Sequence, residues 1–292
     1  MRNGAVGSVA SLWRYPVKSM MGEELDASDV SERGLVGDRA YALVDRETGK
    51  LASAKHPRKW SRLFDFGAVF IEPPRVGDPT PAVCITFPDG FTVTSREPDL
   101  GRMLSEALGR EVTLAASAPE AATFEEVWPA VKGSQLYGNV LPQEGEEVIT
   151  DVPAGFAAPS GAFFDFSAIH LLTTNTLDRL RELAPESRFV VRRFRPNIVV
   201  QFPQARGFVE NNWARRVVAI GKIRLKVIIP TPRCVMTTLA QGDLPSDPRI
   251  LRVTAEYNRI RAGGLGELPC AGVYAAVLTP GTIRRGDPVR LE

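Results

Sequence analysis

The pair Arg233-Cys234 is the strongest candidate for chemistry in this sequence. It follows an apolar run, and we expect Pro230 and Pro232 to end that strand, because a proline fixes φ at about −65° and cannot donate a backbone hydrogen bond. The cysteine would then lie on a rigid turn beside a guanidinium. A neighbouring positive charge favours the thiolate, which binds metals and attacks electrophiles, so we expect a lowered pKa for Cys234. The alternative is a small, buried hydrophobic residue.

Basic and hydroxyl side chains also lie at the ends of other predicted strands. Lys18 and Ser19 follow the first strand of the chain, and Arg39 comes just before another strand. An ammonium, a hydroxyl and a guanidinium are suited to hold a phosphate or a carboxylate. The alternative for Lys18 is a solvated loop position.

A run of three arginines, Arg192, Arg193 and Arg195, precedes a predicted strand at 198–200. Strand alternation predicts that Arg193 and Arg195 point to one side and Arg192 to the other. The planar guanidinium suits bidentate contact with an anion, and the amide of Asn197 could bind the edge of a heterocycle. The alternative is a solvated, charged face.

The elements that position these residues form two halves. The first half reads as short strands at 6–12 and 40–45, a turn at 46–49, a hairpin at 83–94 and a helix at 97–109. In the second half we expect a helix that begins at Thr174 or Asn175 and a helix at 248–261. The strands predicted there are 168–172, 189–191, 198–202, 217–220, 223–229, 273–278 and 288–291. Periodicity fades between them, where Pro, Gly, Ala and Glu dominate.

These patterns predict a mainly β protein with a few helices, of the α+β class. We expect a β-barrel-like N-terminal domain at 1–118, a connector or site-covering loop at 119–162 and a second β-barrel domain at 163–292. A chain of 292 residues with 44% hydrophobic and 24% charged residues can bury a core in each domain.

Composition excludes several functions. A net charge of +2 gives no global attraction to nucleic acid. The three cysteines are far apart, which argues against a disulfide framework and a structural zinc site and favours the cytoplasm. No signal peptide or membrane-spanning run occurs, nor does a nucleotide-binding glycine fingerprint. An iron–sulfur cluster needs about four cysteine ligands, so we expect none on this chain, and no flavin or haem motif is present.

Several short motifs occur in the order and spacing of one known family. They are Tyr15-Pro16-Val17-Lys18-Ser19, Gly37-Asp38-Arg39, Phe194-Arg195-Pro196-Asn197, Arg233-Cys234, Pro280-Gly281-Thr282-Ile283 and Gly286-Asp287-Pro288-Val289. Together they resemble the MOSC family, named after the C-terminal module of molybdenum cofactor sulfurases, in the subgroup with an N-terminal β-barrel domain. Amidoxime-reducing components and N-hydroxylaminopurine-detoxifying proteins share this pattern. The sequence departs from it at Pro232, where relatives often carry serine.

The resemblance implies a molybdenum–molybdopterin cofactor with the Cys234 thiolate as metal ligand and catalytic residue. The residues at matching cofactor-binding positions are Lys18, Ser19, Arg39, Thr173, Thr174, Arg195, Asn197, Arg233 and Tyr274. The implied reaction is reduction of a small N-hydroxylated substrate. Its electrons would come from a separate donor protein, of the ferredoxin type or of the cytochrome b5 type with a reductase.

Two alternatives stay open at this point. The chain could carry the molybdenum cofactor without turnover, or Cys234 could carry sulfur as a persulfide. The chain lacks the domain that generates sulfur with pyridoxal phosphate, so we expect no pyridoxal phosphate here.

Overall fold

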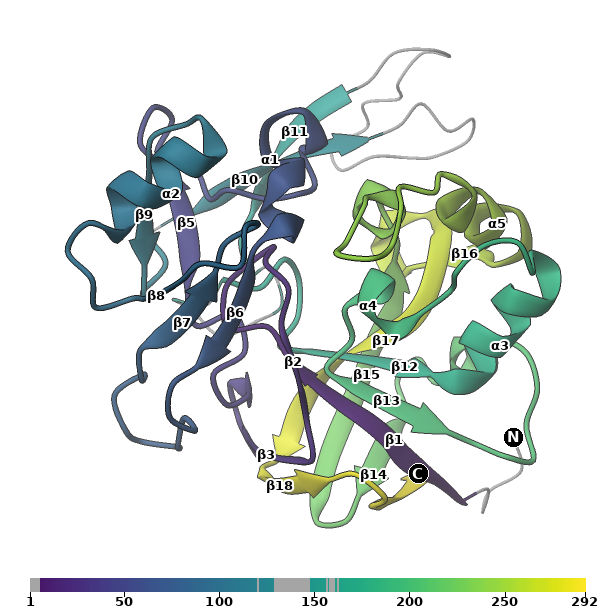
Figure 1. Cartoon of the computed structure of the whole chain (residues 1–292). Coiled ribbons are helices and arrows are strands. Elements are labelled where there is room, and N and C mark those ends of the chain that lie inside the picture. The colour runs from purple at the N-terminus through teal and green to yellow at the C-terminus, as the bar shows by residue number, and fades with distance from the viewer. Residues whose placement is uncertain (1–5, 120, 129–147, 156, 158–160, 162) are drawn as a thin grey trace.

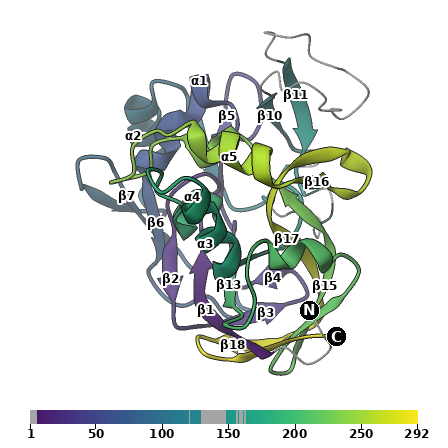
Figure 2. The same ribbon diagram turned by 90° about the vertical axis from the view of Figure 1, so that its right-hand side faces the viewer.

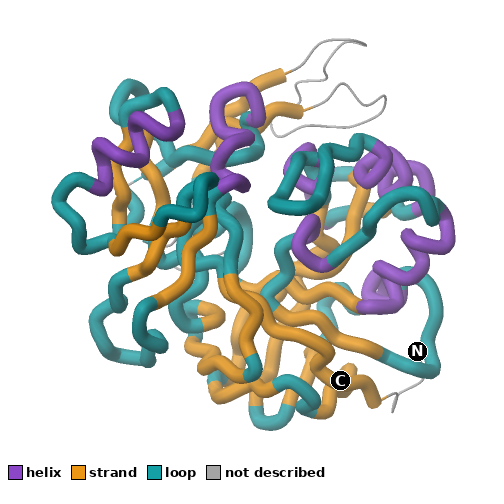
Figure 3. Tube along the Cα trace, viewed as in Figure 1, coloured by secondary structure: helices purple, strands orange, loops and turns teal. Residues whose placement is uncertain are grey.

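The structure is a computed structural model that describes residues 6–119, 121–128, 148–155, 157, 161 and 163–292. Figure 1 shows two lobes: small sheets and α2 lie on the left, and a larger β unit with α3, α4 and α5 lies on the right. Strands dominate both lobes, and helices are few (Figure 3). The predicted mainly β fold class is confirmed.

The larger lobe is a closed barrel of seven strands. Its order is β12-β13-β1-β19-β14-β15-β17, and pairing of β12 with β17 closes the ring. The strands are β1 (Val6–Arg14), β12 (Ile169–Thr173), β13 (Ile198–Gln201), β14 (Val217–Ile220), β15 (Ile223–Pro232), β17 (Glu267–Thr279) and β19 (Pro288–Leu291). Only β12 and β13 pair in parallel; the other neighbours are antiparallel. Alternate buried residues, such as Ile223, Leu225 and Val227, fill the interior.

Two short strands extend this sheet. They are β2 (Glu23–Leu25), which pairs with β1, and β16 (Arg259–Arg261), which pairs with β17. A separate small sheet joins β18 (Gly281–Arg284) to β3 (Ala27–Ser31) and β4 (Gly34–Leu35).

The N-terminal lobe has its own core. Its strands are β5 (Ala42–Asp45) with β9 (Val112–Ala115), and β6 (Gly67–Phe70), β7 (Val83–Thr86) and β8 (Thr92–Thr94). Its helices are α1 (Pro57–Trp60), η1 (Ser61–Asp65) and α2 (Leu100–Leu108). Leu100, Leu104 and Leu108 recur at helical spacing, so their side chains face this core. Gly109, with φ 68°, caps the C-terminal end of α2.

The barrel's helices pack over one side of it, as Figure 2 shows for α3, α4 and α5. Their bounds are α3 (Thr174–Leu183), α4 (Val191–Phe194) and α5 (Arg249–Tyr257), with short 3₁₀ turns η2 (Val209–Asn212), η3 (Val235–Thr238) and η4 (Gly263–Leu265). Among the described residues, none of the helices combines the length and the apolar character needed to cross a membrane.

The connector predicted at 119–162 contains an antiparallel strand pair, β10 (Thr123–Trp128) and β11 (Val148–Pro153). Residues 120, 129–147, 156, 158–160 and 162 lie outside the described residues. The predicted domain boundaries at 118 and 162 stay predictions. Strand pairing connects the two predicted domains, because β1 is a strand of the C-terminal barrel, where it pairs with β13 and β19.

Three other local predictions are wrong. No strand forms at 189–191, because the chain there turns into α4. The strand predicted at 223–229 does not stop before Pro230; β15 continues to Pro232, the second proline, and its register is irregular between the two prolines. The helix predicted at 248–261 ends at Tyr257, and 259–261 form β16.

Candidate functional site

A pocket of about 80 Å³ gathers eight of the residues singled out in the sequence. They are Lys18, Ser19, Arg39, Arg195, Asn197, Arg233, Cys234 and Tyr274. These residues come from the segment after β1, the turn before β5, the end of α4, the end of β15 and the middle of β17. The N-terminal lobe and the barrel both contribute to this pocket.

Three of its residues have strained backbones. Ser19, Arg39 and Arg195 have φ values of 62°, 47° and 52°, in the left-handed region that non-glycine residues rarely adopt. Such conformations cost about 1–3 kcal/mol each and persist where the surroundings impose them. Their convergence on one pocket makes that pocket the candidate functional site.

The ring of Tyr15 makes cation–π contacts with two of the arginines, Arg39 and Arg195. The guanidinium carbons of Arg39 and Arg195 lie 4.5 and 4.1 Å from its ring centroid. Arg39 also pairs with Asp38, which accepts a hydrogen bond from the Tyr15 amide, and Arg195 donates to the Met20 carbonyl. Burial, with Arg39 nearby, lowers the pKa of Arg195 to about 10, so both groups remain cations at neutral pH.

Lys18 is buried and points at Asp165, which the sequence analysis did not identify. Its Nζ donates to the Asp165 carboxylate and, at 3.1 Å, to the Phe163 carbonyl. The signal that could have found Asp165 is a lone carboxylate within the aromatic run Phe163-Phe164-Asp165-Phe166. A buried charge inside such a run needs a partner.

Lys55 is a second missed residue. Its Nζ lies 3.0 Å from Glu126 Oε2 and 3.6 Å from Asp165 Oδ2, and its amine lies 5.1 Å from the Phe124 ring centroid. Burial opposes its charge, but Glu126 and Asp165 outweigh burial and raise the pKa of Lys55 well above its usual range. Lys55 therefore adds another cation to the pocket.

Cys234 is half-buried and follows β15 directly. Burial raises the pKa of its thiol; Lys55 opposes this shift, and Arg233 opposes it only weakly. Arg233 thus acts in the predicted direction, but burial outweighs it, so the predicted net lowering of this pKa is wrong. A metal ion bound at the sulfur would favour the thiolate more strongly than the guanidinium does.

Arg233 lines the same pocket. Its Nη2 donates to the Phe194 carbonyl at 2.8 Å, while its buried Nε has no hydrogen-bond partner. An unpaired buried donor is costly, and an anionic ligand beside it would satisfy it.

The other arginines of the run do not alternate as predicted, because they lie on α4 rather than on a strand. Arg193 is buried and donates to the carbonyls of Thr237, Leu239 and Pro245, which makes it a structural residue. Arg192 pairs with Asp243 near the surface. Of the three, only Arg195 lines the pocket.

Asn197 lies at the pocket, but its amide already binds backbone. Its Oδ1 accepts from the His170 amide at 3.1 Å, and its Nδ2 approaches the Trp13 carbonyl at 3.4 Å.

Thr173 and Thr174 do not line the pocket. Thr173 caps α3 by accepting from the Thr176 amide, one residue before the predicted start, and its hydroxyl donates to buried Glu210 at 2.6 Å.

His170 and Tyr274 form the wall next to β17. Their rings lie 5.7 Å apart, and Tyr274 stacks on Phe166 at 5.2 Å. The His170 ring nitrogens lie 3.4 and 3.3 Å from the carbonyl oxygens of Arg195 and Ala271. Burial, with Arg233 adding to it, holds the pKa of His170 well below its usual range, so the ring is neutral.

Gly272 permits this placement of His170, and Gly272→Ala tests it. An added Cβ would lie 2.5 Å from His170 Nε2 and 2.6 Å from the Leu171 carbonyl oxygen, at φ +86°. We expect a loss of about 2 kcal/mol or more in the free energy of unfolding, measured by urea denaturation. The matched control is Gly49→Ala, with φ +72° and open space around the Cβ, which should cost about 1 kcal/mol. Equal losses in the two variants would contradict the close approach.

Asp165 makes the site sensitive to acid. Burial alone would raise its pKa, but Lys18 and Lys55 outweigh burial and hold the pKa well below its ordinary value of 3.8. Its contribution to stability is thus present above that ordinary value and is lost as the pH falls toward the folded-state pKa. We expect the melting temperature of Asp165→Asn to fall less between pH 5 and pH 3 than that of the wild type, because an aspartate of the unfolded chain takes up its proton in about that range while the folded Asp165 does not. Asp178→Asn, in an exposed pair with Arg181, should keep the wild-type slope.

Taken together, the pocket fits an anionic ligand with a soft metal. Five cationic side chains, Lys18, Arg39, Lys55, Arg195 and Arg233, line it against one carboxylate, Asp165. Arg39 and Phe164 also line another hollow of about 320 Å³. A thiol lies beside the cations, and thiolates suit soft ligation sites.

Comparison with known families agrees with this site. The MOSC domain model matches residues 159–290, and the MOSC N-terminal beta barrel domain model matches residues 6–61. The chain belongs to the MOSC family. The two matched ranges contain all eight of the predicted residues that line the pocket.

This MOSC protein is similar along nearly its whole length to curated relatives. It is 25% identical to mitochondrial amidoxime-reducing component 1 of Mus musculus over 98% of this chain and 82% of the relative. It is also 25% identical to mitochondrial amidoxime reducing component 2 of Homo sapiens, over 97% of this chain and 83% of the relative. The similarity to these relatives therefore includes both lobes.

Two solved structures are similar to this MOSC protein, one over nearly the whole chain and one over part of it. The YuaD protein from Bacillus subtilis matches with a TM-score of 0.46 and 10% identity, over 98% of this chain and 95% of that one. YiiM from Geobacillus stearothermophilus matches with a TM-score of 0.31 and 18% identity, over 43% of this chain and 54% of that one.

Proposed function

We propose that this protein holds molybdenum–molybdopterin in the pocket and reduces N-hydroxylated compounds. The observation that carries the proposal is the convergence of five cations on the half-buried thiol of Cys234. Names of the relatives, which refer to amidoxime reduction, support the same reaction. When bound, the cofactor supplies a metal that exchanges electrons in pairs and accepts oxygen.

Each pocket residue then has a role toward this cofactor. Lys18, Arg39 and Arg195 hold its phosphate by charge-assisted hydrogen bonds, and the Cys234 thiolate is the metal ligand. Arg233 directs its unpartnered Nε at the cofactor. The aromatic wall of Phe166 and Tyr274 excludes water from one side. Ser19 is held in place by the Ala54 amide, which donates to its hydroxyl at 3.1 Å.

The reaction balances as an N-hydroxylated compound plus two electrons and two protons giving the N–H compound plus water. The N–O bond breaks, the substrate is reduced, and the oxygen leaves in water. We propose that a separate protein, of the ferredoxin type or of the cytochrome b5 type with its reductase, delivers the electrons. From cysteine usage we propose a cytoplasmic location, although the relatives are named mitochondrial.

The direct test is metal analysis together with turnover. Protein made in a host that synthesises the molybdenum cofactor should contain about one molybdenum per chain, and with a chemical reductant it should convert benzamidoxime to benzamidine. A protein with bound molybdenum that reduces no N-hydroxylated compound would favour the cofactor carrier instead. A persulfide on Cys234, detected by mass spectrometry in protein without molybdenum, would favour sulfur transfer.

Electron supply gives a further prediction. With NADH or NADPH alone the purified protein should reduce nothing, because the sequence has no dinucleotide-binding fingerprint. Adding a reductase with its carrier protein should restore turnover, measured as benzamidine formed. Sustained turnover of this chain with NADH alone would contradict the need for a separate donor.

A further inference from the structure

A second, smaller hollow of about 40 Å³ lies beside the main pocket. Seven residues line both: Lys55, Asp165, Phe166, Pro232, Arg233, Cys234 and Tyr274. The smaller hollow alone adds Glu126, Val152, Leu265 and Leu268, whereas Lys18, Arg39 and Arg195 line only the main pocket. Its volume is about half that of the main pocket.

The hollow is lined by a buried ion pair to which the proposed cofactor contacts assign no role, although its lysine is one of the five cations that line the main pocket. Lys55 Nζ and Glu126 Oε2 are 3.0 Å apart, with side chains 14% and 4% exposed. Two further contacts position Lys55. Its backbone carbonyl accepts a hydrogen bond from the Val127 amide at 3.0 Å, and its amine lies 3.6 Å from Asp165 Oδ2. Burying two charges is expensive, and apolar residues of similar size would often be at least as stable.

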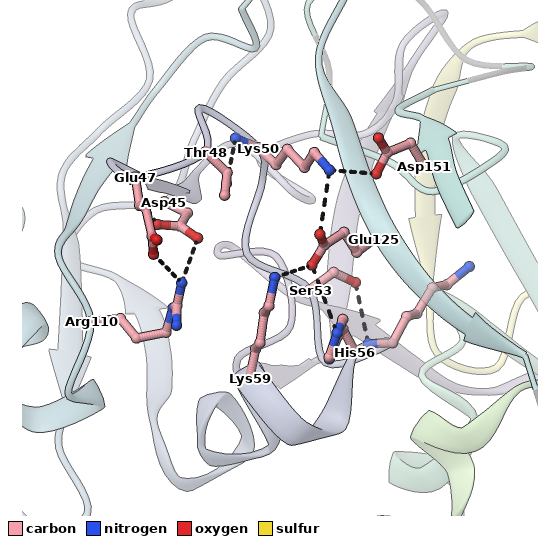
Figure 4. Close-up of polar contacts among 11 residues, drawn as sticks. Asp45, Glu47, Thr48, Lys50, Ser53, His56, Lys59, Arg110, Glu125 and Asp151 are labelled. Carbon is pink, nitrogen blue, oxygen red and sulfur yellow. Dashed lines mark hydrogen bonds and ion pairs between the residues drawn. The ribbon is translucent and has the colours of Figure 1, made fainter. Parts of the chain in front are cut away.

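Strand alternation on β10 separates Glu126 from its neighbour Glu125. Figure 4 shows Glu125 paired with Lys50 and Lys59, and the distances are 3.3 and 2.6 Å. Glu125 lines neither the main pocket nor the smaller hollow. Glu126 shares the opposite face of β10 with fully buried Phe124. The two glutamates therefore differ in surroundings while sharing strand and chemistry, which makes Glu125 a matched control.

Building on the proposed function, we infer that this hollow binds the N-hydroxy head group of the substrate through Lys55 and Glu126. The Lys55 ammonium donates to the N-hydroxyl oxygen, and the Glu126 carboxylate accepts from an N–H or O–H of the same head group. Val152, Leu265 and Leu268 contact the carbon atoms next to it. The pair thus favours head groups that carry a donor and an acceptor side by side over N-oxides that have no N–H or O–H.

The test uses cofactor-loaded, oxidised protein without reductant, and calorimetry with benzamidoxime as the probe. Glu126→Gln should weaken binding of benzamidoxime about tenfold or more, since a charged acceptor is lost. Glu125→Gln should bind it within about twofold of wild type, a change expected of a group outside the hollow. In turnover with a chemical reductant, Glu126→Gln should raise KM much more than it lowers kcat, at unchanged molybdenum content. For N,N-dimethylaniline N-oxide the two variants should not differ.

A second variant guards against misfolding of Glu126→Gln, which leaves Lys55 with a weaker partner. The double variant Lys55→Met with Glu126→Leu removes both charges together, so no unpaired buried ion remains. It should melt as one cooperative unit and lose benzamidoxime binding as Glu126→Gln does. If both variants bind like Glu125→Gln while the wild type turns over benzamidoxime, the inference is wrong and the proposed function stands. If the wild type neither binds nor reduces benzamidoxime, both fail.

Discussion

Replacing Cys234 with serine is expected to abolish reduction of N-hydroxylated compounds and to leave the fold intact. Serine removes the soft sulfur ligand while keeping nearly the same size. The local backbone does not depend on the sulfur, because the Cys234 carbonyl accepts from the Thr237 amide at 3.2 Å and from the Thr237 hydroxyl at 3.0 Å. Benzamidine formation with a chemical reductant measures the loss, and circular dichroism checks the fold.

Cys84→Ser is the matched control for this change. Cys84 lies on β7, the middle strand of the sheet β6-β7-β8, opposite Val69 on one side and Thr94 on the other. It lines neither the pocket nor the smaller hollow. It should keep full activity and the molybdenum spectrum of the wild type. A Cys234→Ser variant with unchanged activity and spectrum would show that the thiolate is not the metal ligand, which would remove the centre of the proposed enzyme.

Lys18→Ala and Arg195→Ala should each reduce cofactor retention by about tenfold or more. Each change removes a charge-assisted hydrogen bond, worth roughly 1.5–3 kcal/mol. Lys18→Ala also leaves Asp165 with Lys55, at 3.6 Å, as its remaining ion-pair partner among the described residues, which adds negative potential where the phosphate would bind. Molybdenum and pterin content, measured on protein expressed under limiting cofactor, gives the result.

The controls are Lys222→Ala and Arg290→Ala, which change exposed basic residues on the barrel and should keep wild-type cofactor content. A second readout is melting, because a ligand that binds only the folded chain raises the melting temperature by mass action. The loaded wild type should melt higher than the empty protein, and the loaded–empty difference should shrink in both pocket variants. Equal cofactor content in all four variants would rule out the phosphate clasp.

Sequence patterns predicted the elements whose periodicity is strong and local. The helix ending at Gly109 and the hairpin of β7 and β8 around Gly90 follow from residue spacing and turn chemistry. Patterns failed where tertiary contacts override them. Arg193 lies on a short helix, where its guanidinium donates to the carbonyls of Thr237, Leu239 and Pro245. The residue pattern at 189–195 does not predict these distant partners.

The candidate site was predictable in part. Lys18, Arg39, Arg195 and Cys234 belong to motifs of the family, and only that resemblance indicated that they meet, since they are far apart in the chain. Lys55, Glu126 and Asp165 belong to no motif, and two of them lie in or next to the segment where periodicity fades. Their importance comes from mutual burial, which a one-dimensional pattern does not contain. The same is true of the raised pKa of Cys234, which depends on burial more than on its neighbour in sequence.

The position of β1 in the barrel has a consequence for how the chain folds during synthesis. β1 is synthesised before the other described strands, yet its residues Val6, Gly7 and Ser8 pair with Arg290, Val289 and Pro288, about 280 residues later in the chain. At about 5–20 residues per second, roughly 15–60 s separate the synthesis of these two strands. Until then residues Val6, Gly7 and Ser8 of β1 have no permanent partner on that edge, and contacts of such long sequence separation form slowly. The barrel can therefore close, and the candidate site beside it can be completed, only after β19 has been synthesised.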